Sequence, residues 1–161
     1  MREYQPIEGL IEAGYCGPAV LAAAAKQQGI EITQRELADV MGTTEKLETS
    51  HEDMMHGAFE AGMNFIAQER LNLGQLNAIR VGGFSVILNW MDGDDDQNDG
   101  HYSLLEDLTP KEIVLNDPSN GGEIRRFSRH EFEQRWFDIN NGKVVRNWSM
   151  ILRRPNGEDN R

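Results

Sequence analysis

The sequence predicts an α+β fold, with helices in the N-terminal half and an antiparallel sheet in the C-terminal half. The apolar run 21–25 belongs to a helix, whereas 84–90 is a short apolar segment rich in strand-forming residues. Because the first helices precede most of the strands, the two kinds of element are expected to segregate. The chain has 161 residues, and we expect a single domain over 1–154 and a flexible tail over 155–161.

Capping residues delimit the helices of the first half. A helix over 16–28 ends before a glycine, and Thr33 and Glu36 have the capping-box spacing that starts a second helix. Thr49 or Ser50 caps a third helix. The core face of this third helix is expected to comprise Met54, Met55, Ala58, Phe59 and Met63.

The remaining elements are mostly strands. We expect strands over 64–68, 84–90, 101–106, 112–115, 123–127 and 144–152. A helix over 74–79 interrupts this series. Ser128 and Glu131 again have capping-box spacing, and they start a last helix that is expected to run to Phe137.

Three residues with complementary chemistry stand at the ends of these elements. Cys16, the only cysteine, opens the first helix in the segment Cys-Gly-Pro-Ala, where helix dipoles and free N–H groups stabilise a thiolate. His101 begins one strand and Asp117 ends the next. A thiol, an imidazole and a carboxylate are the parts of a thiol hydrolase.

Each of these residues also has an ordinary structural explanation when it is taken alone. A single cysteine is most often a small buried apolar residue, and an aspartate before a proline, such as Asp117, is a common turn residue. The conjunction of all three at the ends of elements favours the catalytic interpretation.

The same segments resemble those of the papain-like C39 and C39-like cysteine peptidases. In these families the first helix opens with Cys-Gly-Pro-Ala, the histidine lies in a Gly-His-Tyr strand, and the aspartate lies in an Asp-Pro turn followed by glycine. The chain matches these motifs at 16–19, 100–104 and 117–122, and the resemblance spans about 10–153. It implies a papain-like fold in which the N-terminal helices pack on the C-terminal antiparallel sheet.

The chain departs from the family pattern at one functional position. The families carry a glutamine five or six residues before the cysteine, whose amide helps to form the oxyanion hole, but here Leu10 and Ile11 occupy these positions. Gln5 is the nearest candidate donor, because an ionised Glu12 cannot donate. The backbone N–H of Cys16 supplies another donor.

The resemblance implies catalysis by Cys16 as nucleophile, His101 as proton carrier and Asp117 as the group that orients the imidazole. The bond that is cleaved remains open between a backbone peptide bond in a peptide or protein, which is the family default, an isopeptide bond, and the glutamine side-chain amide that a deamidase or an acyl transferase uses. A non-catalytic acidic binding or inhibitor protein that retains the fold is the other alternative.

Charge restricts the partners of this acidic protein. The formal net charge is -11, with 16 basic and 27 acidic residues, which argues against nucleic acid and is compatible with a basic peptide or protein substrate. His51 and His56 lack a third metal ligand at a recognisable spacing, so we expect neither metal nor cofactor. No membrane-spanning or signal segment is recognisable, and we expect a cytoplasmic protein. The oligomeric state cannot be derived from the sequence.

The densest charge run of the chain, 92–100, directly precedes His101. From Asp95 onward its spacing partly matches a calcium-binding loop, but position three is an amide and no helices flank it. We interpret the run as a solvated acidic loop at the rim of the active-site cleft, where its carboxylates select basic substrate residues or raise the pKa of the imidazole.

Overall fold

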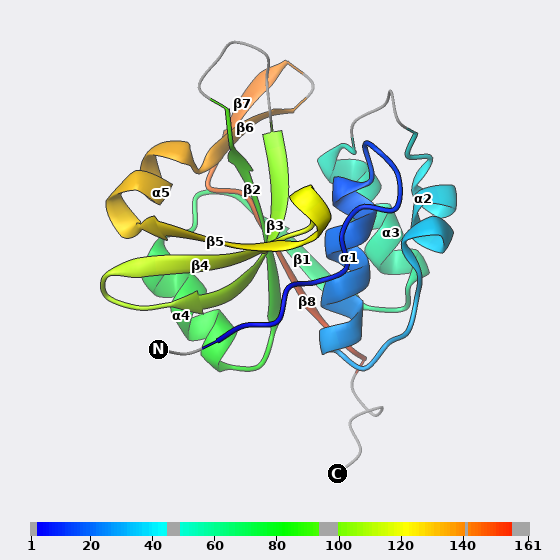
Figure 1. Cartoon of the computed structure of the whole chain (residues 1–161), viewed down its shortest axis with the longest axis horizontal. Coiled ribbons are helices and arrows are strands. Elements are labelled where there is room, and N and C mark those ends of the chain that lie inside the picture. Colours follow the sequence, from blue (N-terminus) through cyan, green and yellow to red (C-terminus); the bar gives the residue numbers. More distant parts are fainter. Residues whose placement is uncertain (1–2, 45–48, 94–99, 141, 156–161) are drawn as a thin grey trace.

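Helices pack on both faces of a central antiparallel sheet, as Figure 1 shows. The computed structural model describes residues 3–44, 49–93, 100–140 and 142–155. Within these ranges the main sheet has six strands in the order β1-β8-β2-β3-β4-β5, and a two-stranded sheet pairs β6 with β7. All neighbouring strands are antiparallel. The α+β class predicted from the sequence is confirmed.

The elements follow one another along the chain with short connections. The helices are α1 (Cys16–Gln27), α2 (Gln34–Met41), α3 (His51–Glu60), α4 (Leu73–Val81) and α5 (Arg129–Arg135), with a short 3₁₀ turn, η1, at Ser119–Gly121. The strands are β1 (Asn64–Gln68), β2 (Ser85–Met91), β3 (Gly100–Leu108), β4 (Glu112–Asp117), β5 (Glu123–Ser128), β6 (Phe137–Asn140), β7 (Lys143–Arg146) and β8 (Ser149–Arg153).

The first three helices form one half of the core with one face of the sheet. Val20 and Leu21 of α1 are fully buried there, together with Leu37 of α2 and Met54 of α3. The capping box predicted at Thr33 is present, and Ser50, one of the two caps predicted for the third helix, caps α3 and also forms a capping box. These caps satisfy free N–H groups at the helix starts and so fix where α2 and α3 begin.

The opposite face of the sheet is covered by α4 and α5. Leu76 of α4 and Phe132 of α5 are fully buried against Trp90 of β2 and Leu115 of β4. Since strand residues alternate between the two faces, β2 contributes to both halves of the core and is buried along its whole length. Because β2 is packed on both faces, its C-terminal end, which leads to Asp92, is held in place by the core.

The prediction of a single strand over 144–152 is wrong, because the chain forms two strands there, β7 and β8. Asn147 lies between the two strands with a φ of 55°, in the left-handed region that interrupts an extended chain. Its N–H donates to the carbonyl of Trp136. This turn sends β7 to the small sheet and β8 to the centre of the main sheet.

Two further sequence expectations need correction. The last helix was expected to reach Phe137 but ends at Arg135, because Trp136 leaves the helical conformation and its indole N–H donates to the carbonyl of Trp148. Phe59 was expected on the core face of α3 but is 69% exposed.

Parts of two other expectations lie outside the described residues. These parts are 156–161 of the predicted tail and 94–99 of the acidic loop. Among the residues described, no helix is both long enough and apolar enough to cross a membrane.

Candidate active site

The thiol of Cys16 is presented by the first residue of α1. The side chain is partly buried, and its sulfur lies 3.3 Å from the backbone nitrogen and 3.2 Å from the backbone oxygen of Tyr102 in β3. These contacts fix the start of α1 against the beginning of β3. The N-terminal end of a helix favours negative charge, so this position suits a thiolate.

The glycine and proline that follow the cysteine have separate structural roles. A Cβ atom on Gly17 would lie 2.7 to 2.8 Å from side-chain atoms of Thr49, so only glycine allows this close packing. Pro18 occupies the first turn of the helix, where a backbone N–H has no partner within the helix. The Cys-Gly-Pro segment therefore allows α1 to begin in close contact with Thr49.

The imidazole of His101 lies between the thiol and a carboxylate. Its Nδ1 atom is 3.4 Å from the sulfur of Cys16, and its Nε2 atom is 2.6 Å from Oδ1 of Asp117. The ring also packs against Trp90 in a T-shaped arrangement, with ring centroids 5.5 Å apart. Because each ring nitrogen has a polar neighbour, the orientation of the imidazole is fixed. It is the orientation that the ring would need in order to carry a proton to or from the thiol.

Asp117 is fully buried at the end of β4. Its Oδ1 atom also accepts a hydrogen bond from the backbone N–H of Ser119 at 2.9 Å, which places the carboxylate against η1. The hydroxyl oxygen of Ser119 lies 3.3 Å from Nε2 of His101. The Asp-Pro turn thus holds both the carboxylate and a polar neighbour beside the imidazole.

The charges in this cluster stabilise one another. Burial lowers the pKa of His101, but the charge of Cys16 and the hydrogen bond to Asp117 outweigh burial and hold this pKa well above its usual 6.5. Burial raises the pKa of Asp117, and the hydrogen bond and charge of His101 reverse this effect, so the pKa lies below its usual 3.8. The arrangement therefore favours an imidazolium paired with the carboxylate.

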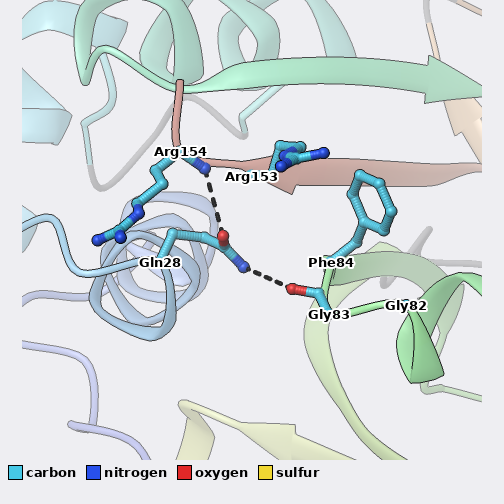
Figure 2. A pocket seen from close by; sticks show the side chains of 6 residues that line it. All are labelled: Gln28, Gly82, Gly83, Phe84, Arg153 and Arg154. Atoms are coloured by element: carbon cyan, nitrogen blue, oxygen red, sulfur yellow. Dashed lines mark hydrogen bonds between the residues drawn. The ribbon is translucent and has the colours of Figure 1, made fainter. Parts of the chain in front are cut away.

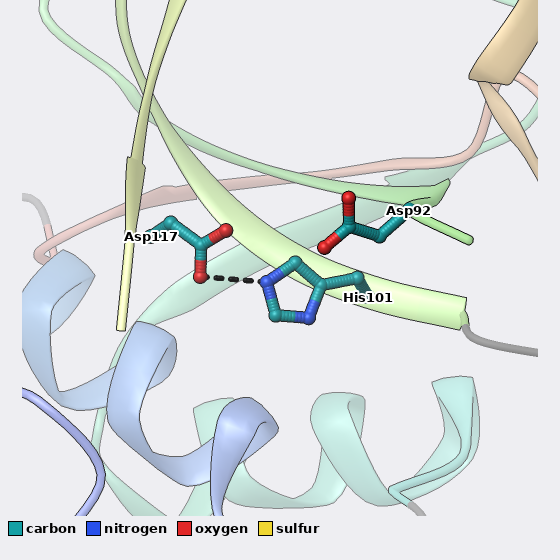
Figure 3. A group of neighbouring side chains, drawn as sticks. All are labelled: Asp92, His101 and Asp117. Carbon is teal, nitrogen blue, oxygen red and sulfur yellow. Dashed lines mark hydrogen bonds and ion pairs between the residues drawn. The ribbon is translucent and has the colours of Figure 1, made fainter. Parts of the chain in front are cut away.

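A second carboxylate, that of Asp92, approaches the imidazole from the end of β2 (Figure 3). Asp92, His101 and Asp117 each offer an atom within 4.8 Å of the others, a spacing that a metal ion could bridge. However, both carboxylates already contact the guanidinium of Arg125, and His101 uses both nitrogens within the cluster. We therefore assign this group to the thiol site and not to a metal centre.

The sequence predicted Gln5 as an oxyanion donor, and the structure places it in the extended N-terminal segment. Its side chain is exposed, and its backbone carbonyl accepts a hydrogen bond from Nδ2 of Asn116 at 2.8 Å. None of the hydrogen bonds among the described residues connects its amide with Cys16. The role of Gln5 therefore stays a prediction.

A polar hollow of about 160 Å³ lies beyond the opposite end of α1 (Figure 2). Gln28 closes one side of it, because its amide donates to the carbonyl of Gly83 and accepts from the backbone N–H of Arg154. Its lining contains no thiol, imidazole or carboxylate. The hollow therefore lacks the kinds of groups that gather at the start of α1.

Several solved structures that are similar to this chain are described as peptidases or peptidase domains. The peptidase domain of Streptococcus ComA is 20% identical, with a TM-score of 0.72 over 94% of this chain and 100% of that one. A Bacillus anthracis protein described as a C39-like peptidase is 12% identical, with a TM-score of 0.72 over 93% of this chain and 94% of that one. At such low identities, these similarities establish the fold alone.

A third similar structure contains a bound peptide. It is a double glycine motif protease from an AMS/PCAT transporter in complex with a leader peptide. It is 18% identical, with a TM-score of 0.67 over 96% of this chain and 94% of that one. Among curated proteins, no sequence matches the chain.

The fold and the sequence family together define the class of protein. The α+β architecture is that of the papain-like C39 peptidase domains, and the model of the Peptidase C39 family matches residues 11–140. The chain therefore belongs to the Peptidase C39 family and is a cysteine peptidase-like enzyme. The resemblance recognised from the sequence motifs is confirmed.

Proposed function

We propose that this protein hydrolyses a backbone peptide bond in a peptide or protein through a triad of Cys16, His101 and Asp117. The observation that carries the proposal is the position of one imidazole between a thiol at 3.4 Å and a buried carboxylate at 2.6 Å. This arrangement provides a nucleophile, a proton carrier and a group that orients the carrier.

The reaction proceeds in two halves. In the first, the thiolate of Cys16 attacks the carbonyl carbon, the carbon–nitrogen bond breaks, and Nδ1 of His101 gives its proton to the leaving amine. A thioester then joins the acyl group to Cys16. In the second, His101 accepts a proton from water as the water attacks the thioester, and the acid leaves while the thiolate–imidazolium pair forms again.

Asp117 supports both halves without taking part in proton transfer. Its hydrogen bond to Nε2 keeps Nδ1 directed at the sulfur, and its charge stabilises the imidazolium. The developing oxyanion needs donors near Cys16. We propose the backbone N–H of Cys16 and the amide of Gln5 for this role, which requires the Gln5 side chain to turn toward Cys16 when substrate binds.

The substrate class that we propose to test first is a peptide with a Gly-Gly motif. One similar structure is described as a double glycine motif protease in complex with a leader peptide, which supports this choice. The net charge of -11 further favours peptides with basic residues. The cytoplasmic location expected from the sequence stays a prediction.

The test is cleavage of a set of peptides with and without the Gly-Gly motif, measured by mass spectrometry. We expect the wild-type protein to release two fragments from at least one peptide, and Cys16→Ala to release none. The exposed residue Asp39 gives a matched control, and Asp39→Asn is expected to cleave like the wild type. Release of ammonia without chain cleavage would identify a deamidase, and binding without turnover would favour the non-catalytic alternative.

A further inference from the structure

Arg125, on β5, contacts the carboxylate oxygen of Asp117 that the histidine does not use. One of its terminal nitrogens lies 3.4 Å from Oδ2 of Asp117, while Oδ1 of the same carboxylate faces His101. Arg125 is opposite Leu115 in the β4–β5 register, so it shares a face of the sheet with Asp117, two residues further along β4. The guanidinium thus contacts the carboxylate oxygen of Asp117 that does not face the imidazole.

The same guanidinium binds Asp92 with two parallel hydrogen bonds. Its terminal nitrogens lie 3.1 and 2.9 Å from the two oxygens of that carboxylate. This bidentate arrangement fixes the plane of the guanidinium, which a lysine ammonium could not do. Arg125 therefore connects the end of β2 with the end of β4.

Two aromatic side chains hold Arg125 in place. The guanidinium carbon lies 5.3 Å from the ring centroids of both Trp90 and Phe127. Trp90 is itself fully buried and also touches the ring of His101. These contacts restrict the guanidinium to one position and provide cation–π attraction.

From this geometry we propose that Arg125 is a positioning residue of the active site, which orients Asp117 and neutralises Asp92 beside the imidazole. The proposal rests on the proposed function and deepens it. The charges then alternate in sign along a chain of contacts from Asp92 through Arg125, Asp117 and His101 to the thiolate of Cys16. Each charged group thereby has an opposite charge as its neighbour.

The alternation has a direct effect on the proton of His101. Without Arg125, two carboxylates would face the imidazole, the imidazolium would be overstabilised, and its proton would be transferred less readily to the leaving amine. Without Asp92, the positive charge of Arg125 would be only partly balanced and would destabilise the imidazolium. The two residues should therefore shift the pKa of His101 in opposite directions.

Charged groups around the imidazole come from several elements, and among them Arg135 of α5 donates to the backbone carbonyl of Asp92 at 2.9 Å. Cys16 approaches from α1, Asp117 from β4, Arg125 from β5 and Asp92 from the end of β2. Glu123, at the start of β5, makes a further and longer ion pair with Arg125 at 3.8 Å. Asp138 of β6 lies against Gly100, the residue before the histidine, and contacts His51 at 3.6 Å. The substitutions below leave Glu123 and Asp138 unchanged.

The first test is the NMR titration of the His101 imidazole, which needs no enzymatic activity. We expect Arg125→Gln to raise the His101 pKa by about half a unit to one unit, and Asp92→Asn to lower it by a similar amount. The double variant should return to within about 0.3 unit of the wild type. Arg126→Gln is the matched control, because Arg126 is the next residue of β5 and pairs with Glu112.

The second test is the pH dependence of peptide cleavage. Arg125→Gln should lower kcat by about tenfold with little change in KM, and Arg125→Lys should restore part of this loss, because lysine returns the charge without the bidentate geometry. The alkaline limb of the profile should move with the His101 pKa in each variant.

Two outcomes would overturn the proposal. They are shifts of the same sign in Asp92→Asn and Arg125→Gln, and a titration of Asp92→Asn that is unchanged from the wild type. If Arg125→Gln fails to fold, Arg125→Lys decides, because it keeps the charge without the bidentate contact. A wild-type kcat in Arg125→Lys would then overturn the proposal. A wild-type protein that cleaves no peptide while the titrations shift as expected would reject the proposed function and retain the electrostatic role of Arg125.

Discussion

Replacement of Asp117 by asparagine removes the charge opposite the imidazolium while it keeps the shape of the side chain. The carboxylate is fully buried and lies 2.6 Å from Nε2 of His101, so solvent screens this pair weakly. Two unit charges about 4 Å apart attract by about 4 kcal/mol at an effective dielectric constant of about 20. The cost of removing both groups from water reduces the net effect to about 2 to 3 kcal/mol.

This magnitude sets the expected result for the Asp117→Asn variant. A loss of about 2 to 3 kcal/mol corresponds to a decrease in kcat of about 30-fold to 150-fold. The pKa of His101 should fall by about 1.5 to 2 units, and the alkaline limb of the activity profile should move down with it.

The assay is peptide cleavage followed over a range of pH, with thermal unfolding measured on the same samples. The control is Asp39→Asn, because it removes the same charge from an exposed position. An Asp117→Asn protein that is folded, keeps more than about a third of the wild-type kcat and has an unchanged pH profile would refute the reasoning.

Asp117 should make the stability of the fold sensitive to acid, because folding lowers the pKa of its carboxyl group. Its contribution to the free energy of unfolding is present above about pH 4 and is lost as the pH falls through the folded-state pKa. Urea unfolding at a series of pH values measures this loss. Gly17→Ala should destabilise the fold by about 1 to 3 kcal/mol in urea unfolding, because its Cβ would meet Thr49, and Thr49→Ala in the same protein should recover part of this loss. Unchanged stability would contradict the packing argument. Gln5→Ala should lower kcat about 100-fold without changing alkylation of Cys16 by iodoacetamide, whereas a loss below about threefold would remove Gln5 from the oxyanion hole.

The parts of the site that the sequence predicted are those with local signals. Cys16 stands before a glycine and a proline, and proline is tolerated in a helix only within its first turn, so the segment marks a helix start. The motifs around His101 and Asp117 mark the ends of neighbouring strands. The structure brings these three side chains together because β3 and β4 are adjacent and α1 packs on the start of β3.

Arg125 carried no such signal. It follows an isoleucine and precedes a second arginine in a strand, so the sequence alone cannot say which arginine points toward the site. Its role depends on its pairing opposite Leu115 and on aromatic neighbours that are distant in sequence. The break at Asn147 was missed for a similar reason, because only tertiary contacts reveal a left-handed residue within an otherwise strand-like segment.

The central claim is that Cys16 and His101 act as a thiolate–imidazolium pair, and the rate of alkylation by iodoacetamide at about pH 6 tests it most directly. Since the chain has a single cysteine, intact mass reports the modification of Cys16 alone. We expect the wild-type protein to be labelled at least about tenfold faster than free cysteine, and His101→Ala to be labelled at about the rate of free cysteine. Labelling of the wild type at the free-cysteine rate, unchanged in His101→Ala, would contradict the account.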